Sequence, residues 1–124
     1  MDFNNLNYVF GCIQAKTSIR DRVGRDREFS LPVMEQHFWS VAVTLDGAYL
    51  AMPKFEHMVN GGGDTQYCEN GWHGMYAMSN ICTKDRIYYD KDLELLIEDS
   101  SQAAQKFISA RQRFDKYWKA IHNI

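Results

Sequence analysis

Apolar side chains between Phe38 and Met52 fall into two runs that Asp46-Gly47 separates. Aspartate followed by glycine accepts the positive φ angles of a tight turn, so the pattern predicts a two-stranded β-hairpin that Pro53 ends. Pairing the strands across this turn predicts a core face formed by Val41, Val43, Leu45, Ala48, Leu50 and Met52. The opposite face would be solvated or lightly covered, and it carries Ser40, Ala42, Thr44, Tyr49 and Ala51.

The first thirty residues show a helical pattern followed by a charged one. Residues 3–16 place Leu6, Val9, Phe10 and Ile13 at the i, i+3, i+4 and i+7 positions of an amphipathic helix. Residues 17–30 have little apolar content and alternate arginines with acids. We therefore expect a helix over 3–16 and a solvated segment or loop over 17–30.

The second half of the chain favours helices. Asp64 or Thr65 could cap a helix whose apolar face recurs at helical spacing through Cys68, Trp72, Met75, Tyr76, Ser79 and Cys82. Residues 83–99 fit either a strand at Ile87-Tyr88-Tyr89 or a helix that begins near Asp90 or Asp92. Ser100 or Ser101 would cap a long final helix with a stripe of Ala103, Phe107, Ala110, Phe114, Tyr117, Trp118 and Ile121.

These patterns together predict the fold class. We expect one α+β domain over residues 1–124, with a small antiparallel sheet built around the 38–52 hairpin. Three to four helices, including the long C-terminal one, would pack on this sheet. A chain of this length can bury a single hydrophobic core.

Composition and charge indicate the cellular compartment but no particular binding partner. Lys and Arg number 14 against 16 Asp and Glu, and this net charge of −2 is too balanced to indicate a nucleic-acid-binding protein. The three cysteines form no dense framework, and the chain opens without a basic and then apolar leader, so we expect a reduced, cytoplasmic protein. No apolar run approaches the roughly 18 residues that cross a bilayer.

Three kinds of chemistry can be weighed and set aside. A cysteine nucleophile would need one of His37, His57, His73 and His122 as its base, but the surroundings of Cys12, Cys68 and Cys82 suit small core residues. The spacing of Cys68, His73 and Cys82 matches no common zinc motif. The glycine loop also lacks the Lys-Ser or Lys-Thr of a phosphate-binding loop. We therefore expect no catalytic residues, no cofactor and no metal ligands.

Two segments remain as candidates for binding a partner. One is the loop Asn60, Gly61, Gly62, Gly63 and Asp64, where three glycines remove any preference for helix or strand. The other is the arginine group Arg20, Arg22, Arg25 and Arg27. These arginines could grip phosphates, but Asp21, Asp26 and Glu28 between them favour a self-paired, solvated face.

The order of these elements resembles the ArdB/KlcA antirestriction family over roughly residues 38–121. The matching pieces are the Trp39-led strand, the Gly47-to-Pro53 segment, the Asn60-to-Gly63 loop, the segment from Gly71-Trp72 onward, and the aromatic helix from Phe107 to Ile121. The resemblance implies a non-enzymatic protein of plasmid or phage type that inhibits a host DNA-restriction system. Its partner would be a host defence protein such as a type I restriction complex. The resemblance implies no catalytic residue in this chain.

The leading hypothesis is therefore an anti-defence factor that acts by protein–protein interaction, without membrane association or direct nucleic-acid binding. A generic interaction or accessory domain, which could be a homodimer, is the main alternative. A small cysteine-dependent enzyme comes next, and a nucleic-acid-binding protein comes last.

Overall fold

The computed structural model describes residues 2–3, 6–7, 9–18, 23–46, 50, 52–62, 66–79 and 85–114. Along the chain its elements are β1 (Asp2–Phe3), β2 (Leu6–Asn7), β3 (Gly11–Ser18), α1 (Val23–Glu35), β4 (Trp39–Asp46), α2 (Pro53–Asn60), β5 (Gly74–Ala77), β6 (Ile87–Tyr89) and α3 (Glu94–Phe114). None of the helices described here is long and apolar enough to cross a lipid bilayer.

The centre of the fold is a four-stranded sheet in the order β3-β4-β5-β6, and every neighbouring pair in it is parallel. Gly11 pairs with Trp39 and Lys16 with Thr44, so β3 and β4 run side by side and end at the same edge. Parallel neighbours need crossover connections, and helices supply two of them here. The fold is therefore α/β, and the prediction of an antiparallel α+β sheet is wrong.

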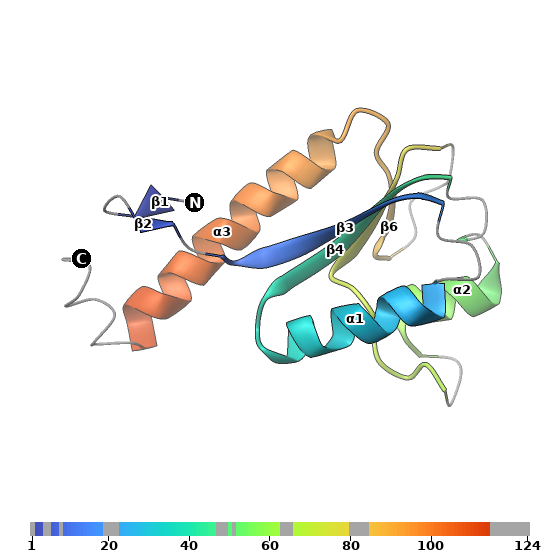
Figure 1. Cartoon of the computed structure of the whole chain (residues 1–124), viewed down its shortest axis with the longest axis horizontal. Helices are drawn as coiled ribbons and strands as arrows, with labels where there is room; N and C mark the ends of the chain where they lie inside the picture. The colour runs from blue at the N-terminus through green and yellow to red at the C-terminus, as the bar shows by residue number, and fades with distance from the viewer. Residues whose placement is uncertain are drawn as a thin grey trace.

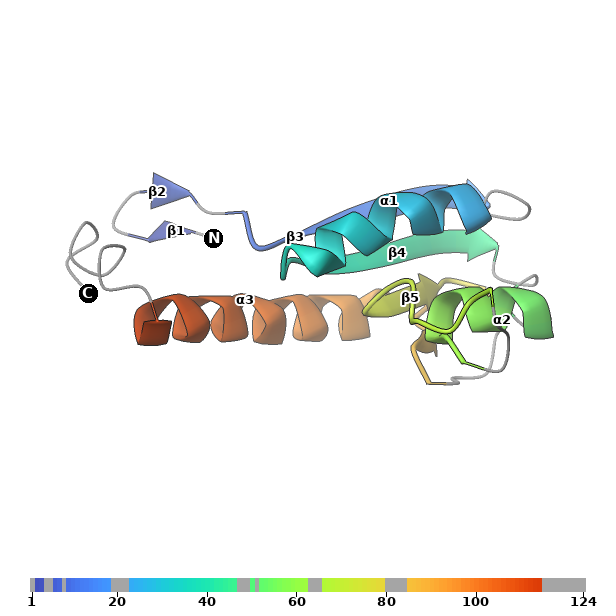
Figure 2. The same ribbon diagram turned by 90° about the horizontal axis from the view of Figure 1, so that it is seen from below.

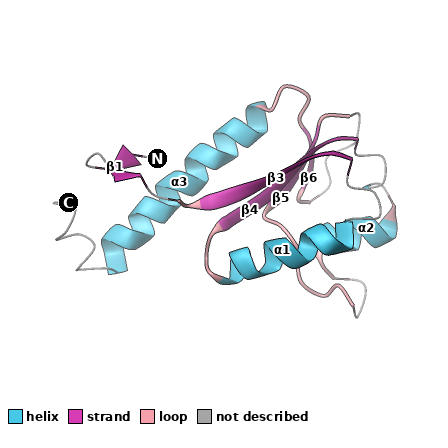
Figure 3. Ribbon diagram, viewed as in Figure 1, coloured by secondary structure: helices cyan, strands magenta, loops and turns pink. Residues whose placement is uncertain are grey.

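Helices cover both faces of this sheet (Figure 1; Figure 2). On one face α1 and α2 pack over a core that includes Val23, Met58 and Trp72. On the other face Leu96 of α3 packs against Val41 and Tyr76. The sheet therefore forms the middle of three layers (Figure 3).

The predicted hairpin does not form, because β4 uses both of its edges for strands from elsewhere in the chain. It pairs in parallel with β3 on one side and with β5 on the other. Leu50 lies in a 3₁₀ turn, Pro53 starts α2, and residues 47–49 and 51 lie outside the described part. The expected core residues Leu45 and Met52 are 53% and 51% exposed.

The face of β4 that was expected to be solvated is instead fully buried. Ser40, Ala42 and Thr44 are at most 1% exposed beneath the helices. A strand in the middle of a parallel sheet is covered on both faces, so its two sides cannot be told apart by apolar alternation. The hydroxyls are satisfied there: Ser30 and Ser40 share a hydrogen bond of 2.7 Å, and Thr44 donates to the Thr17 carbonyl.

The predictions for the N-terminal third are also wrong. Residues 11–18 form β3 rather than part of a helix, and Ile13 is 51% exposed. The stretch expected to be a loop contains the start of α1. The buried residues of α1 are Val23, Asp26, Arg27 and Ser30, and most of them are polar. The helix packs on the sheet although its sequence shows no hydrophobic repeat that would have predicted it.

Up to residue 79, the segment expected to be a helix over Cys68–Cys82 is irregular chain and the short strand β5, all four residues of which are buried. Residues 80–82 lie outside the described part. The open alternative for residues 83–99 resolves into both forms, since β6 covers Ile87–Tyr89 and α3 begins at Glu94. The long final helix thus starts six residues before Ser100. The buried Asp90 caps it by accepting the Leu95 and Leu96 backbone N–H groups.

Helix α1 ends in a Schellman motif that carries histidine where glycine is usual. Phe38 N–H donates to the Val33 carbonyl and His37 N–H to the Met34 carbonyl, while His37 has a φ of 65°. A side chain in this left-handed region costs about 1 kcal/mol or more.

We expect His37→Gly to raise the free energy of unfolding by up to about 1 kcal/mol in urea denaturation. His57→Gly, inside α2, is the control and should lower it by about as much.

Candidate functional site

The carboxyl ends of β3 and β4 form one edge of the sheet, and Lys16 lies on it. Lys16 is exposed, pairs in register with the buried Thr44, and is the one Lys or Arg within strands β3 to β6. Ligands of open α/β sheets bind in the crevice outside the carboxyl ends of the strands. The sheet therefore presents a cation at the edge where such folds bind their ligands.

The beginning of α1 adds to the positive character of this edge. Only residues 19–22 separate β3 from α1, so the helix starts beside the end of the strand, as Figure 1 shows. Unpaired backbone N–H groups and the helix dipole make a helix N-terminus attractive to anions. Arg25, in the first turn of this helix, is exposed. Lys16, Arg25 and the start of α1 are called the carboxyl-edge site below.

An acidic side chain also lies in the first turn of α1. Asp26 is 5% exposed, and its Oδ2 accepts no hydrogen bond within the described residues. The Gln14 side-chain amide donates to the Asp26 backbone carbonyl at 3.1 Å. Gln14 and Lys16 are two residues apart and share one face of β3. The same edge therefore holds an exposed cation and a buried carboxylate, one oxygen of which has no hydrogen-bond partner in the described part of the chain.

The two described members of the predicted arginine group differ in their surroundings, and partner binding by the group stays a prediction. Arg20 and Arg22 lie outside the described residues, and Arg25 is exposed. Arg27 is buried, donates to the Met58 and Glu69 carbonyls at 2.9 and 2.5 Å, and stacks over Tyr67. Arg27 thus joins α1 to α2 and to the segment before β5, which is a structural role.

The predicted glycine loop is also tied into the fold where it is described. Asn60 Oδ1 accepts the Arg86 N–H at 2.9 Å, which fixes the approach to β6. Gly61 has a φ of 78°, and a Cβ there would meet Asn70 N at 2.5 Å. Gly62 has open space around it, and Gly63 and Asp64 lie outside the described residues. Partner binding by this loop stays a prediction.

The cysteine and zinc readings gain no support from the described residues. Cys12 Sγ contacts Ser40 Oγ at 3.7 Å, beside the Ser30–Ser40 hydrogen bond. Cys68 is exposed on irregular chain, and Cys82 lies outside the described part. Where the chain is described, no three His, Cys, Asp or Glu side chains are arranged to hold a metal ion.

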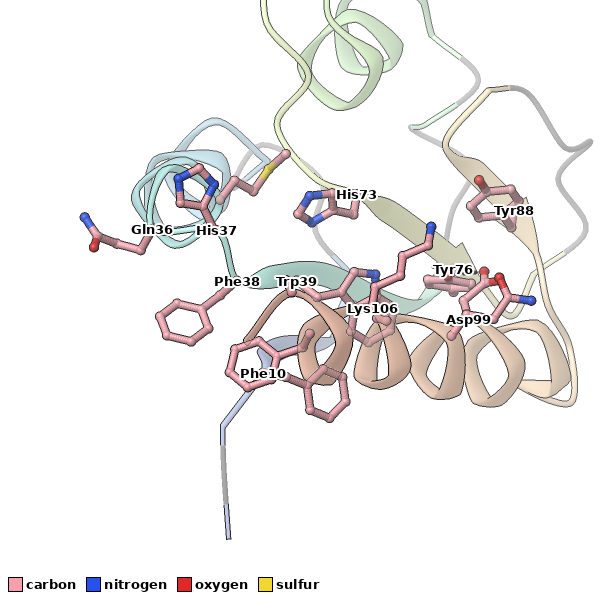
Figure 4. Close-up of a pocket in the computed structure, with 15 residues that line it drawn as sticks. Phe10, Gln36, His37, Phe38, Trp39, His73, Tyr76, Tyr88, Asp99 and Lys106 are labelled. Carbon is pink, nitrogen blue, oxygen red and sulfur yellow. Dashed lines mark hydrogen bonds between the residues drawn. The ribbon is translucent and has the colours of Figure 1, made fainter. Parts of the chain in front are cut away.

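A groove of about 990 Å³ opens at the other end of the sheet, between α3 and the amino ends of the strands (Figure 4). Its aromatic walls are the stacked pairs Phe10–Trp39 and Phe38–Phe107, with centroids 6.2 and 6.3 Å apart. Tyr76 donates to Asp99 Oδ2 at 2.5 Å, and this bond ties β5 to α3. Burial, then the Asp99 bond, raises the pKa of Tyr76 far above its ordinary value, so the phenol stays protonated.

His73 also lines the groove, and it is held as a neutral acceptor. Its Nδ1 accepts the Ser40 backbone N–H at 3.0 Å. Burial, and secondly the charge of Arg86, lower its pKa below the ordinary value. The groove is therefore aromatic with few charges, unlike the cationic carboxyl edge.

A parallel sheet between helical layers, with a cation and a carboxylate at its carboxyl edge, defines an α/β protein with a charged site at the ends of its strands. A profile of the family described as BsaWI restriction endonuclease type 2 matches residues 1–113. The chain belongs to this family. No curated protein sequence matches it.

One solved structure is similar along nearly the whole chain. It is described as the crystal structure of a pre-specific restriction endonuclease BsaWI–DNA complex, with a TM-score of 0.81 and 54% sequence identity. The match covers 96% of this chain and 44% of that one, so this chain spans less than half the length of its relative.

These findings correct the functional hypothesis. The resemblance to the ArdB/KlcA family is wrong, because the matching family consists of restriction endonucleases and not of their inhibitors. A non-enzymatic role, a type I restriction complex as partner and the exclusion of nucleic acid are overturned by the same match and by the DNA-bound relative. A single domain over 1–124 and a homodimer remain predictions.

Sequence reasoning missed Lys16 and Asp26. Lys16 was assigned to a helix, and Asp26 was counted only as a charge that neutralises the arginines. The available signal was a lysine followed closely by two arginines, Arg20 and Arg22.

Proposed function

We propose that this protein is a DNA endonuclease whose carboxyl-edge site holds the DNA backbone and the phosphate to be cleaved. The observation that carries the proposal is the exposed Lys16 at the carboxyl edge of a parallel sheet, beside the start of α1, in a chain of a restriction endonuclease family. Most contacts that hold a protein on DNA go to phosphate and sugar, and Lys, Arg and helix N-termini supply them.

The local arrangement explains how a protein with a net charge of −2 could bind DNA. Six of its 16 acids lie between Asp85 and Asp99, on α3 and the chain around β6, whereas Lys16 and Arg25 lie on β3 and at the start of α1. Such a local field attracts a polyanion even where the total charge does not. The sequence-based argument from balanced charge against nucleic-acid binding therefore has little weight.

Cleavage of a phosphodiester requires stabilisation of developing negative charge. Water adds to phosphorus, one phosphorus–oxygen ester bond breaks, and the leaving sugar oxygen takes up a proton. A fixed cation next to the phosphate oxygens stabilises this transition state more than the ground state. Lys16 is the side chain of the carboxyl edge that suits this role.

Nucleases commonly use divalent cations, which stabilise the attacking and leaving oxygens. Asp26 carries the hard oxygen donors that Mg²⁺ prefers, but its Oδ2 is buried, and no three His, Cys, Asp or Glu side chains among the described residues are arranged to hold a metal ion. The residues described at this edge therefore do not by themselves form a metal site, and the role assigned to the edge is that of Lys16 facing the phosphate.

The salt dependence of DNA binding tests the location of this surface. For double-stranded DNA, the logarithm of the binding constant falls with the logarithm of salt by about 0.9 for each phosphate neutralised. In fluorescence anisotropy with a duplex, we expect Arg25→Ala to weaken binding and to lower this slope by about one. Lys106→Ala, on α3 at the opposite end of the sheet, is the matched control. Equal slopes for all three proteins would contradict the proposal.

A further inference from the structure

One hydrogen-bonded chain crosses the interior directly behind the carboxyl edge. Trp72 is fully buried, and its indole Nε1–H donates to Gln14 Oε1 at 2.9 Å. Gln14 Nε2 in turn donates to the Asp26 backbone carbonyl at 3.1 Å. The side chain of Gln14 therefore joins β3 to α1 and to the segment that precedes β5.

Both ends of the Gln14 amide have a partner in this chain. Its oxygen has a buried indole donor, and its nitrogen has a backbone acceptor in the first turn of α1. The amide is thereby held in one orientation. A flip would point its NH₂ group at the indole N–H and its oxygen at the backbone carbonyl, and both hydrogen bonds would be lost. Gln14 acts as a rigid spacer between strand and helix.

The spacer lies next to two charged residues of this edge, Lys16 and Asp26. Lys16 follows Gln14 by two residues on the same face of β3, and Asp26 is the residue whose carbonyl Gln14 binds. The segment that carries Trp72 is fixed from its other side, since Arg27 binds the Glu69 carbonyl and Gly71 N–H donates to Val59. Trp72 therefore cannot move freely with Gln14.

We propose that Gln14 is a positioning residue, held by Trp72, which sets the separation of the Lys16 ammonium and the Asp26 carboxylate. This inference rests on the proposed function, because it assigns Gln14 a role in that site. A displacement of about 1 Å in a reacting geometry can cost a hundredfold in rate. Loss of the spacer should therefore impair the chemical step more than DNA binding.

The test is a double-mutant cycle on DNA cleavage with Gln14→Met, Lys16→Ala and both together. Gln14→Met should lower kcat by about tenfold or more with KM changed by less than about twofold, since it misplaces a group that acts in the transition state. In the Lys16→Ala background it should change kcat by less than about twofold, because residues that act as a unit are non-additive. If the two substitutions lower kcat by factors that multiply in the double mutant, the inference is wrong.

Two further variants separate positioning from folding. Trp72→Phe keeps the ring in the core but removes the N–H, and it should reproduce the kcat loss in weaker form. Ile87→Val trims a core residue on β6, the edge strand opposite β3, and should leave kcat unchanged. If Lys16→Ala itself cleaves normally, the proposed function fails. If only Gln14→Met and Trp72→Phe cleave normally, the positioning role alone fails.

Discussion

Lys16→Ala is expected to lower the rate of DNA cleavage by about 10² to 10³, the usual cost of removing one preorganised group that stabilises transition-state charge. Lys16 is the one cation on the four central strands, so no neighbour on the sheet can replace it. Single-turnover cleavage with protein in excess over DNA measures this loss without interference from product release.

Two controls make the result specific to the Lys16 ammonium. Lys16→Arg keeps the charge but changes its shape and should recover part of the rate. Lys106→Ala removes a lysine of α3 at the other end of the sheet and should cleave at the wild-type rate. A Lys16→Ala protein that is folded and cleaves at the wild-type rate would contradict the assignment.

Arg27→Ala is expected to lower the free energy of unfolding by about 2 to 4 kcal/mol, since it leaves the Met58 and Glu69 carbonyls without their charged donor. Arg27 is buried, and its stem also packs where the missing side chain of Gly71 allows it to pass. Urea denaturation followed by circular dichroism measures this change.

Arg25→Ala is the natural control, because it removes the same kind of side chain two residues away on the same helix. Arg25 is exposed, so its loss should change the free energy of unfolding by no more than about 0.5 kcal/mol. Each variant should therefore change a different quantity: Arg27→Ala lowers the free energy of unfolding, and Arg25→Ala lowers the affinity for DNA. Equal losses of stability would show that Arg27 does not bridge the helices.

The local elements that carry their own signals were predictable from sequence. Ile87-Tyr88-Tyr89 was recognised as a strand candidate, and the long terminal helix was expected although it begins earlier, at Glu94. The helix expected near Asp90 or Asp92 as one alternative and the helix expected from Ser100 are one continuous helix, which Asp90 caps across a turn with Leu93 at a φ of 58°. Short-range patterns thus located elements better than their ends.

The sheet could not be predicted in the same way, because its buried surfaces are not uniformly apolar. Ser40 and Thr44 are buried on β4, and Asp26, Arg27 and Ser30 are buried on α1. Each of these side chains has hydrogen-bond partners or a site role that exists only once the elements pack. Asp-Gly after β4 was read as a hairpin turn, whereas the partners of β4 come from residues 11–18 and 74–77.

The site depended on the sheet and was missed with it. Lys16 becomes part of an edge only when β3 lies in parallel beside β4, and Asp26 joins it only when α1 packs on that face. Of the arginine group, sequence reasoning noted the charge but could not separate the exposed Arg25 from the buried Arg27. That distinction follows from the contacts of the 66–71 segment.

The most direct test of the account is to incubate the purified protein with unmodified plasmid DNA and Mg²⁺ and to separate the products by electrophoresis. The account predicts discrete fragments with the wild-type protein and intact plasmid with Lys16→Ala under the same conditions. Intact plasmid with folded wild-type protein, or the same fragments with Lys16→Ala, would contradict it.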